Sequence, residues 1–379
     1  MKNIFRIIVC LAAVAFMCSA SRSETQKIRI AVLRGAGDFV LTVRGPYTVT
    51  DAKTGAVLEQ GRRLRRSQVF VHKDGIAVGK NIFTSGQIVI RTTHDIKLQT
   101  SDSKKFYRGA VRIVTENRKL TVINELDLED YVKGVLYHEI SDEWPMEAMK
   151  AQAVAVRTYA LYQMGNSKSR PYDVTNDIYS QVYGGRSAER YRTNLAVEKT
   201  SGQHLTFKGK VLPAYFHSNS GGHTENAAAL WDVDLPPLYG RKDPYAEGMP
   251  KYRWKRNFKS SDVQEKLEKG GFNVGVIKDI KIVEKTPSGR AKTLRFYSRD
   301  GKITDVDAYK FRHAVGPNVI LSNLFSVEMQ GYYFDLIGRG WGHGVGLCQW
   351  GANRMAQSQR SYQEILQFYY PGAKLERSS

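Results

Sequence analysis

The stretch "YVKGVLYHEISDEWPMEAMKAQAVAVRTYAL", residues 131–161, has the apolar spacing of two consecutive amphipathic helices. Apolar residues recur in it every three or four positions, whereas they alternate with polar residues in the segments before it. The spacing predicts one helix over 127–140 and a second over 145–164. Pro145 suits the first position of the second helix, where its missing N–H costs no hydrogen bond.

The first predicted helix carries a carboxylate on its apolar stripe. Glu139 occupies the i+11 place of the stripe that begins at Leu128. One interpretation is a core glutamate satisfied by an arginine or by backbone N–H groups. The other is a general acid, because desolvation raises the pKa of a carboxyl group toward neutral pH. Helical geometry leaves both open, and the neighbouring His138 is either a partner or a bystander.

The second predicted helix carries two cations along one edge. Lys150 and Arg157 lie two turns apart beside its apolar row, and Gln152 is near them in sequence. Two cations on one helical edge are usually solvated. If they faced a carboxylate-bearing substrate, they would form a clamp for it.

Outward from this stretch, strands and helices come in separate blocks, which indicates the α+β class. A helix is expected over 189–200, and a less patterned basic stretch over 243–269. The chain of 379 residues is long enough for one large domain with a smaller attachment. The segments expected to form strands or hairpins are 27–34, 38–45, 56–61, 68–72, 87–93, the hairpin 111–126 with its turn near Asn117, the hairpin 203–218, and the strands 277–286 and 292–306.

The first residues are expected to be a secretory signal peptide. Lys2 and Arg6 precede the apolar run IIVCLAAVAFMC, which is too short to span a bilayer comfortably. We expect residues 1–23 to be removed, with cleavage after Ala20, Ser21 or Ser23. A lipoprotein anchor at Cys18 is the alternative, although the two residues before it are large where a lipobox has small ones. We therefore expect export to the periplasm or cell envelope.

Removal of residues 1–23 would leave one cysteine, Cys348, and so no internal disulfide. It would also lower the formal net charge from +20 to +17, because three cations leave with the segment. Such a balance favours polyanionic partners. For an exported chain these are cell-wall glycan, anionic wall polymers or a membrane surface contacted at most peripherally, and not nucleic acid. A solubilising surface excess is the plainer explanation.

The segment FHSNSGGHTE, residues 216–225, gathers polar side chains around two glycines. A polar hairpin end is the plain interpretation. A zinc peptidase is an alternative, but the spacing is His-x5-His and the chain has no H-E-x-x-H; His343 and Cys348 would complete a zinc site only by proximity. A Ser–His nucleophile is also open, although no G-x-S-x-G elbow is present. The polar residues of the segment are His217, Ser218, Ser220, His223 and Glu225.

The run GRGWGHGVG, residues 338–346, follows an expected strand and precedes an expected helix. It fails the G-x-G-x-x-G register from every glycine and is not followed by Lys-Ser/Thr, so it is not a nucleotide loop. Its glycines suggest close backbone approach to a sugar or to another chain segment.

Four blocks together resemble the SpoIID/LytB family of bacterial cell-wall proteins. They are LEDYVKGVLYHEI, WPMEAMKAQAVAVRTYAL, AYFHSNSGGHTEN and GRGWGHGVGLCQWGA, in family order. The resemblance covers about 105–375 and implies a mixed helix and strand catalytic domain over 105–379. The short β segments before it indicate a β-rich N-terminal region over 24–104, which lies outside the four blocks. Departures from the family pattern are His138, Ser180 and Cys348, where the family commonly has a small residue, a cysteine and a serine.

The resemblance implies a peptidoglycan lytic transglycosylase that prefers strands stripped of stem peptides by an amidase. The family's catalytic glutamate falls on Glu139. No metal or cofactor is expected. Stripping uncovers a lactyl carboxylate on each muramic acid, which the clamp of Lys150 and Arg157 would recognise. The residues expected to contact the glycan are Lys150, Gln152, Arg157, Tyr183, His217, Ser218, Ser220, Glu225, His343 and Gln349.

Three other functions stay open at this point. A non-catalytic wall-binding module that enhances an amidase would use the same groove without the acidity of Glu139. A lysozyme-type hydrolase would need a second catalytic carboxylate, such as Glu225 or Asp177. A zinc peptidase is the third.

Overall fold

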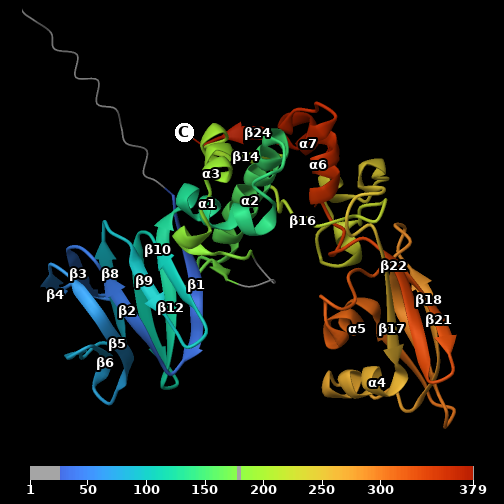
Figure 1. Cartoon of the computed structure of the whole chain (residues 1–379), viewed down its shortest axis with the longest axis horizontal. Helices are drawn as coiled ribbons and strands as arrows, with labels where there is room; N and C mark the ends of the chain where they lie inside the picture. The colour runs from blue at the N-terminus through green and yellow to red at the C-terminus, as the bar shows by residue number, and fades with distance from the viewer. Residues whose placement is uncertain (1–25, 177–180, 379) are drawn as a thin grey trace, which may run out of the picture.

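The computed structural model describes residues 26–176 and 181–378, and it confirms the expected α+β class. The expected signal peptide lies outside these residues. Figure 1 shows a β-rich part and a second mixed module on either side of a helical part. In the described ranges, no helix has the length and apolar character needed to cross a membrane.

The N-terminal part is a sandwich of two sheets. Its strands are β1 (Lys27–Ala36), β2 (Asp38–Val43), β3 (Tyr47–Asp51), β4 (Val57–Gly61), β5 (Leu64–His72), β6 (Gly75–Val78), β7 (Asn81–Phe83), β8 (Gln87–Thr92), β9 (Ile96–Gln99), β10 (Lys104–Tyr107), β11 (Ala110–Glu116), β12 (Lys119–Asp127) and β13 (Val174–Thr175). The strand orders are β13-β1-β12-β11-β8-β3-β4 and β10-β9-β2-β5-β6-β7. Alternate apolar residues point inward from both sheets, such as Leu41 from β2 and Ile90 from β8, and form one core.

The hairpin of β11 and β12 has the predicted turn. Asn117 and Arg118 have φ values of 49° and 56°, the left-handed pair that matches the twist of two antiparallel strands. These strands pair with β8 and β1, so they belong to the sandwich. The expected division between residues 104 and 105 falls inside β10, which pairs with β9. The sandwich therefore continues to Asp127, because hydrogen bonds join the strands on both sides of that division.

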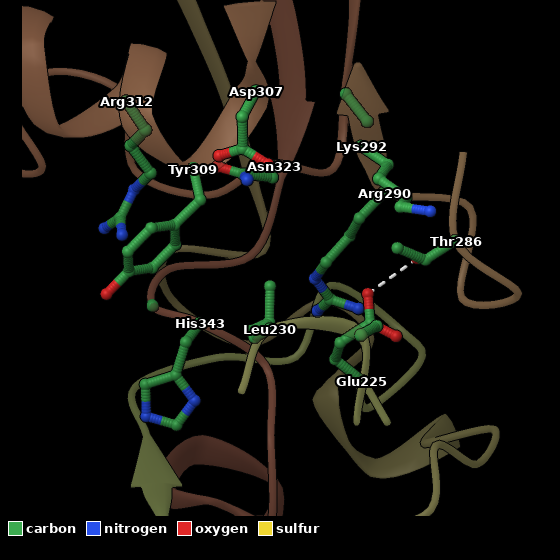
Figure 2. Close-up of a pocket in the computed structure, with 13 residues that line it drawn as sticks. Glu225, Leu230, Thr286, Arg290, Lys292, Asp307, Tyr309, Arg312, Asn323 and His343 are labelled. Carbon is green, nitrogen blue, oxygen red and sulfur yellow. Dashed lines mark hydrogen bonds between the residues drawn. The ribbon is translucent and has the colours of Figure 1, made fainter. Parts of the chain in front are cut away.

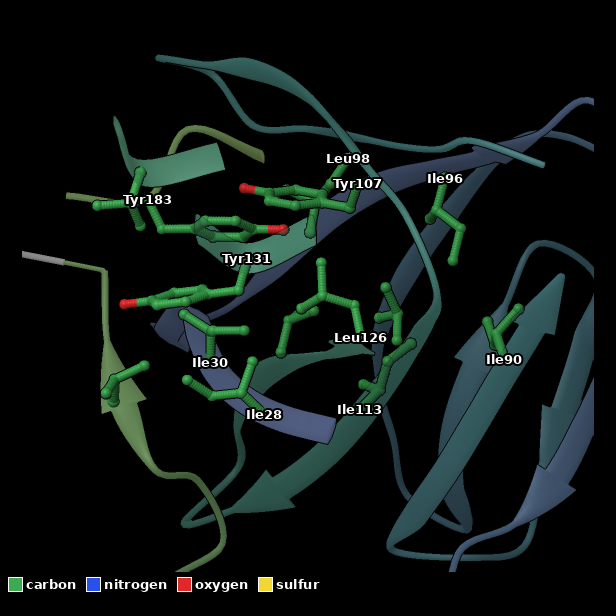
Figure 3. Packing of buried hydrophobic residues seen from close by; sticks show 14 of the residues in the cluster. Ile28, Ile30, Ile90, Ile96, Leu98, Tyr107, Ile113, Leu126, Tyr131 and Tyr183 are labelled. Carbon is green, nitrogen blue, oxygen red and sulfur yellow. The ribbon is translucent and has the colours of Figure 1, made fainter. Parts of the chain in front are cut away.

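The predicted helices follow directly. They are α1 (Leu128–Glu139), α2 (Met146–Asn166) and α3 (Tyr191–Lys199). Pro145 caps α2 one residue before the position expected for it. The apolar stripe of α1 is buried as predicted, and it packs the helix onto the sandwich. The rings of Tyr131 and Tyr183 lie 5.3 Å apart, beside Ile28 and Ile30 of β1 (Figure 3). The apolar stripe members are Leu128, Tyr131, Val132, Val135, Leu136 and Ile140.

The chain's last segments return to the helical part. They include the three-stranded sheet of β15 (Lys210–Val211), β14 (Gln203–Phe207) and β24 (Lys374–Arg377), and the helices α6 (Gln349–Gln357) and α7 (Tyr362–Tyr369). The hairpin expected over 203–218 ends early, because Pro213 has no N–H to continue the ladder. The next strand, β16 (Phe216–His217), pairs in parallel with β23 (Leu347–Cys348).

A second module is inserted before β23. It has two three-stranded sheets, made of β17 (Arg253–Lys259), β22 (Tyr333–Arg339) and β21 (Phe325–Gln330), and of β18 (Ile277–Lys285), β19 (Ala291–Ser298) and β20 (Ile303–Asp307). Two helices, α4 (Ser260–Lys269) and α5 (Ala308–Val315), pack with them. The stretch over 243–269 was expected to be less patterned, yet it contains β17 and α4. The pattern of β17 is faint because Trp254 is its one buried residue.

Candidate active site

A groove of about 490 Å³ lies between the helical part and the second module. Glu139 of α1 and Tyr159 of α2 line it from the helical part, and Tyr309 of α5 lines it from the module. In Figure 1, β16 lies between α2 and the module that carries α5. The groove brings together five of the residues expected from the sequence, which are Glu139, His217, Ser218, His343 and Gln349.

Glu139 is the last residue of α1, and its carboxyl group is incompletely hydrogen-bonded. The side chain of Gln349 donates to Oε2 over 3.2 Å. Burial raises the pKa of Glu139 to about 7, although the hydrogen bonds from Gln349 and from the backbone of Val182 oppose the shift. A substantial fraction of this carboxyl group is therefore protonated at neutral pH, and it can donate a proton.

Of the histidines that line the groove, His217 and His343 are in their neutral forms. Nδ1 of His217 donates to the carbonyl of Val345 over 3.1 Å, and the N–H of Val345 donates to Nδ1 of His343 over 3.0 Å. Burial lowers the pKa of His217 well below its ordinary value, and that of His343 to about 3. Both rings therefore act as uncharged hydrogen-bonding groups and not as cations for an acidic substrate.

The glycine-rich segment contacts another part of the chain, which was one of the two possibilities the sequence left open. Gly340 has a φ of 80°, and a Cβ there would lie 2.6 Å from the carbonyl oxygen of Asn219. A Cβ on Gly342 would lie 2.7 Å from Cβ of His217. The glycines thus let this segment lie against the one that carries His217, and they bring His343 beside it.

Aromatic side chains form part of the groove, and the sequence did not identify them as site residues. The rings of Tyr215 and Trp231 lie 4.4 Å apart, and Trp231 lies 5.1 Å from the ring of His343. Such faces are suited to packing against sugar rings. Tyr215 and Trp341 lie within the blocks AYFHSNSGGHTEN and GRGWGHGVGLCQWGA, which is the signal that could have found them.

The expected clamp on α2 does not face the groove. Arg157 is 1% exposed, and its guanidinium donates to both oxygens of Glu129 over 2.6 and 2.7 Å and to backbone carbonyls. Lys150 pairs with Glu147 over 2.6 Å. Gln152 is buried, and its amide atoms have no hydrogen-bond partner among the described residues. Arg157 joins α2 to α1, Lys150 pairs within α2, and none of the three residues lines the groove, so the structure corrects the clamp hypothesis.

Two further expected residues are also buried away from the groove. The hydroxyl of Tyr183 donates to Asn124 over 2.8 Å within the sandwich core. The hydroxyl of Ser220 donates to Asp243 over 2.7 Å. Both are satisfied inside the protein, and neither lines the groove. We attribute structural roles to them.

Glu225 lines a small cavity of about 20 Å³, large enough for about one water molecule, which shares His343 and Tyr309 with the groove but lies outside it (Figure 2). Its Oε2 accepts from the hydroxyls of Thr286 over 2.6 Å and Ser288 over 2.8 Å. The backbone N–H of Asn226 donates to Oε1 over 2.8 Å. Glu225 is therefore saturated with donors and does not face Glu139 across the groove. Asp177, the other carboxylate considered for a hydrolase, lies outside the described residues.

A family model described as stage II sporulation protein matches residues 116–207. The chain is 31% identical to stage II sporulation protein D of Bacillus amyloliquefaciens over 306 residues, 76% of this chain and 85% of that protein. The chain belongs to the SpoIID/LytB family. It is also 34% identical to an uncharacterized protein of Brachyspira hyodysenteriae over 361 residues, 92% of each chain. A protein named amidase enhancer in Bacillus subtilis is 30% identical over 291 residues, 64% of this chain and 40% of that protein.

A second model, described as a domain of unknown function (DUF8618), matches residues 238–346. Glu139 lies within the SpoIID match, and α5 lies within this second match. The groove is thus lined by residues from both matched regions of the SpoIID/LytB chain. Residues 27–115 of the sandwich precede both.

Proposed function

We propose that this chain is a lytic transglycosylase that cleaves the bond between N-acetylmuramic acid and N-acetylglucosamine in peptidoglycan. Membership in the SpoIID/LytB family supports a role at the cell wall. One observation carries the finer proposal. Glu139 is the one carboxyl group among the described residues that line the groove, and its pKa is raised to about 7.

A single carboxyl group is sufficient for this reaction. Protonated Glu139 donates its proton to the glycosidic oxygen as the bond to C1 of the muramic acid breaks. The resulting carboxylate then takes the proton of the C6 hydroxyl, whose oxygen attacks C1 and closes a 1,6-anhydro ring. The proton returns to Glu139, and no water is consumed. A two-acid hydrolase needs a second carboxylate facing the first.

Gln349 suits the second half of this cycle. Its amide donates to Oε2 of Glu139, and a hydrogen bond of this kind favours the charged form of a carboxyl group. At 3.2 Å this hydrogen bond is too weak to cancel the effect of burial, so Glu139 is still partly protonated at neutral pH. The packed aromatic rings of Tyr215 and Trp231 give the groove a surface on which a sugar ring can pack.

The substrate that we propose is glycan stripped of its stem peptides, with an amidase as the functional partner. Export to the periplasm or cell envelope, and the positive charge of the chain, are consistent with such a polymer. Since Arg157 and Lys150 do not reach the groove, recognition of the lactyl carboxylates requires other residues.

Mass spectrometry of products tests the reaction. Amidase-treated peptidoglycan is digested by the chain without residues 1–23 and by its Glu139→Gln variant, which keeps the size of the side chain. We expect anhydro-muramyl ends from the unmodified protein alone. Reducing ends would indicate hydrolysis and would overturn the proposal. The fold of both proteins is compared by circular dichroism.

A second candidate is a non-catalytic enhancer of an amidase, favoured by the 30% identity to the protein named amidase enhancer. It predicts that no glycan ends of either kind appear. It also predicts that the Glu139→Gln variant stimulates peptide release by an amidase as well as the unmodified protein does.

A further inference from the structure

The outer face of one sandwich sheet carries four positive side chains that neither the groove nor the core uses. We call Arg44, Arg66, Lys97 and Lys104 the cationic face. Lys97 of β9 lies opposite Thr42 of β2 in the register, and its neighbours Ile96 and Leu98 point into the core. Alternation along the strand therefore turns Lys97 outward. Arg66 lies on β5, Lys104 on β10, and Arg44 directly follows β2.

The four charges are close together and uncompensated within the described chain. None of them forms an ion pair with a described residue, although ion pairs join many other cations of the molecule, such as Arg112 to Glu125. Burial of its stem lowers the pKa of Lys97, and the charges of Lys104, Arg66 and Arg44 lower it further. Like charges held at one place repel one another, and a polyanion would relieve that repulsion.

The charge of the chain is concentrated in this part. Residues 27–127 contain 19 lysines and arginines against 9 aspartates and glutamates, a formal net charge of +10. That is more than half of the +17 expected for the chain without its signal peptide. A general solubilising excess would be spread more evenly over the surface.

Positive charge also lies between the sandwich and Glu139. Strand β10 contacts the turn η1 (Gly185–Ala188), where the N–H of Phe106 donates to the hydroxyl of Ser187 over 3.0 Å. Burial lowers the pKa of His138 most, and the positive charges of Lys105 on β10 and of Arg190 lower it further. His138 directly precedes Glu139, so this charge lies beside the end of α1.

We propose that the cationic face binds the carboxylates of a peptide-stripped glycan strand whose cleavage site lies in the groove. This inference rests on the proposed function and names the surface that selects its substrate. Removal of a stem peptide converts the lactyl amide of muramic acid into a carboxylate, which gives the strand a regular row of negative charges. Lys105, on the opposite face of β10 from Lys104, and Arg190 add positive charge near Glu139. The buried Arg157 has no part in it.

A binding experiment tests this assignment without requiring cleavage. All proteins carry Glu139→Gln, and the affinity for purified stripped strands is measured by co-sedimentation. The face variant replaces its four cations by glutamine (R44Q, R66Q, K97Q and K104Q). Exposed pairs contribute up to about 1 kcal/mol each, so we expect at least about a tenfold loss of affinity and a shallower dependence on salt.

Matched controls separate this result from a general charge effect. The control variant replaces four other exposed cations that form no ion pair with a described residue. They are Lys278, Lys285, Lys302 and Arg377. It should bind like the parent protein. Strands whose lactyl carboxyls have been amidated should bind the parent and the face variant equally weakly.

Three outcomes would overturn the inference. The first is unchanged glycan binding by the face variant, and the second is an equal loss of glycan binding in the control variant. The third is that the face variant loses binding to vesicles containing an anionic phospholipid, measured in the same way, but keeps its binding to glycan. Unfolding midpoints verify that each variant is folded, and the double variant R66Q/K97Q should show a smaller loss in the same direction. Because no strand is cut here, failure of the proposed reaction would leave this result unaffected.

Discussion

Glu139 is partly buried at the edge of a groove and Glu225 is buried, and their surroundings differ. Glu139 borders a groove of about 490 Å³ and receives one side-chain hydrogen bond, from Gln349 over 3.2 Å. Glu225 borders a cavity of about 20 Å³ and receives hydroxyl hydrogen bonds from Thr286 and Ser288 over 2.6 and 2.8 Å.

The difference shows that burial alone does not decide whether the pKa of a carboxyl group rises. Withdrawal from water makes a carboxylate costly, and the donors around it determine how that cost is met. At Glu225 the donors satisfy the carboxylate and hold two chain segments together. At Glu139 they are too few, so the pKa rises to about 7, and the space in front can admit a substrate.

The largest expected effect is the loss of cleavage in Glu139→Gln. Without a proton to donate or a base to recover it, the rate should fall at least about a thousandfold, within the range of general acid–base catalysis. The rate of anhydro-product formation measures this. If a folded Glu225→Gln variant lost cleavage and Glu139→Gln did not, Glu225 and not Glu139 would be the general acid.

Arg157→Ala should lower stability rather than substrate affinity. The guanidinium is 1% exposed and paired with Glu129, and removing one partner of such a pair costs about 3 kcal/mol. Urea unfolding measures this loss. Lys150→Gln, at a more exposed pair within the same helix, is the control and should cost much less. A stable Arg157→Ala protein with weakened glycan binding would restore the clamp hypothesis.

The pH dependence of stability should distinguish Glu139 from a satisfied carboxylate. Its pKa is about 7 in the folded protein against 4.5 ordinarily, so the folded state binds the proton more tightly. The protonated Glu139 stabilises the folded state fully below pH 4.5, and this stabilisation is lost as the pH rises through 7. Relative to Glu139→Gln, the unmodified protein should therefore lose up to about 3 kcal/mol between pH 4.5 and pH 8. Urea unfolding at both pH values measures the free energy of unfolding of each protein. An equal change with pH in both proteins would contradict the raised pKa of Glu139.

Glu225→Gln should destabilise the protein by about 2 kcal/mol, because an amide cannot accept all the donors that now surround the carboxylate. The unfolding midpoint measures this. The folded fraction should still cleave glycan, in contrast to Glu139→Gln. Thr286→Val, which removes one of the hydroxyl donors, should have a smaller effect in the same direction.

The smallest effect is expected for Gln349→Ala. Its amide favours the charged form of Glu139, so its removal should raise that pKa further, by less than about one unit, since a single long bond is lost. The alkaline limb of the pH–rate profile should move to higher pH. Gln163→Ala, at another residue lining the groove, should leave the limb in place.

The sequence predicted what depends on local periodicity. The stripe of α1 is periodic, so both the helix and the unusual position of Glu139 could be identified. Arg157 has equally regular spacing on α2, but its partner Glu129 comes from another helix, and helical spacing carries no information about that contact. Tyr309 was missed for a similar reason, because α5 reaches the groove only through the packing of the second module.

The most direct measurement is the titration of Glu139 itself by infrared difference spectroscopy between the unmodified protein and Glu139→Gln. We expect a protonated-carboxyl band that is assigned to Glu139 and disappears with a midpoint near pH 7. A midpoint near 4.5 would mean that Glu139 is an ordinary carboxylate at neutral pH. It would then have no proton to donate, and the single-acid mechanism would be contradicted.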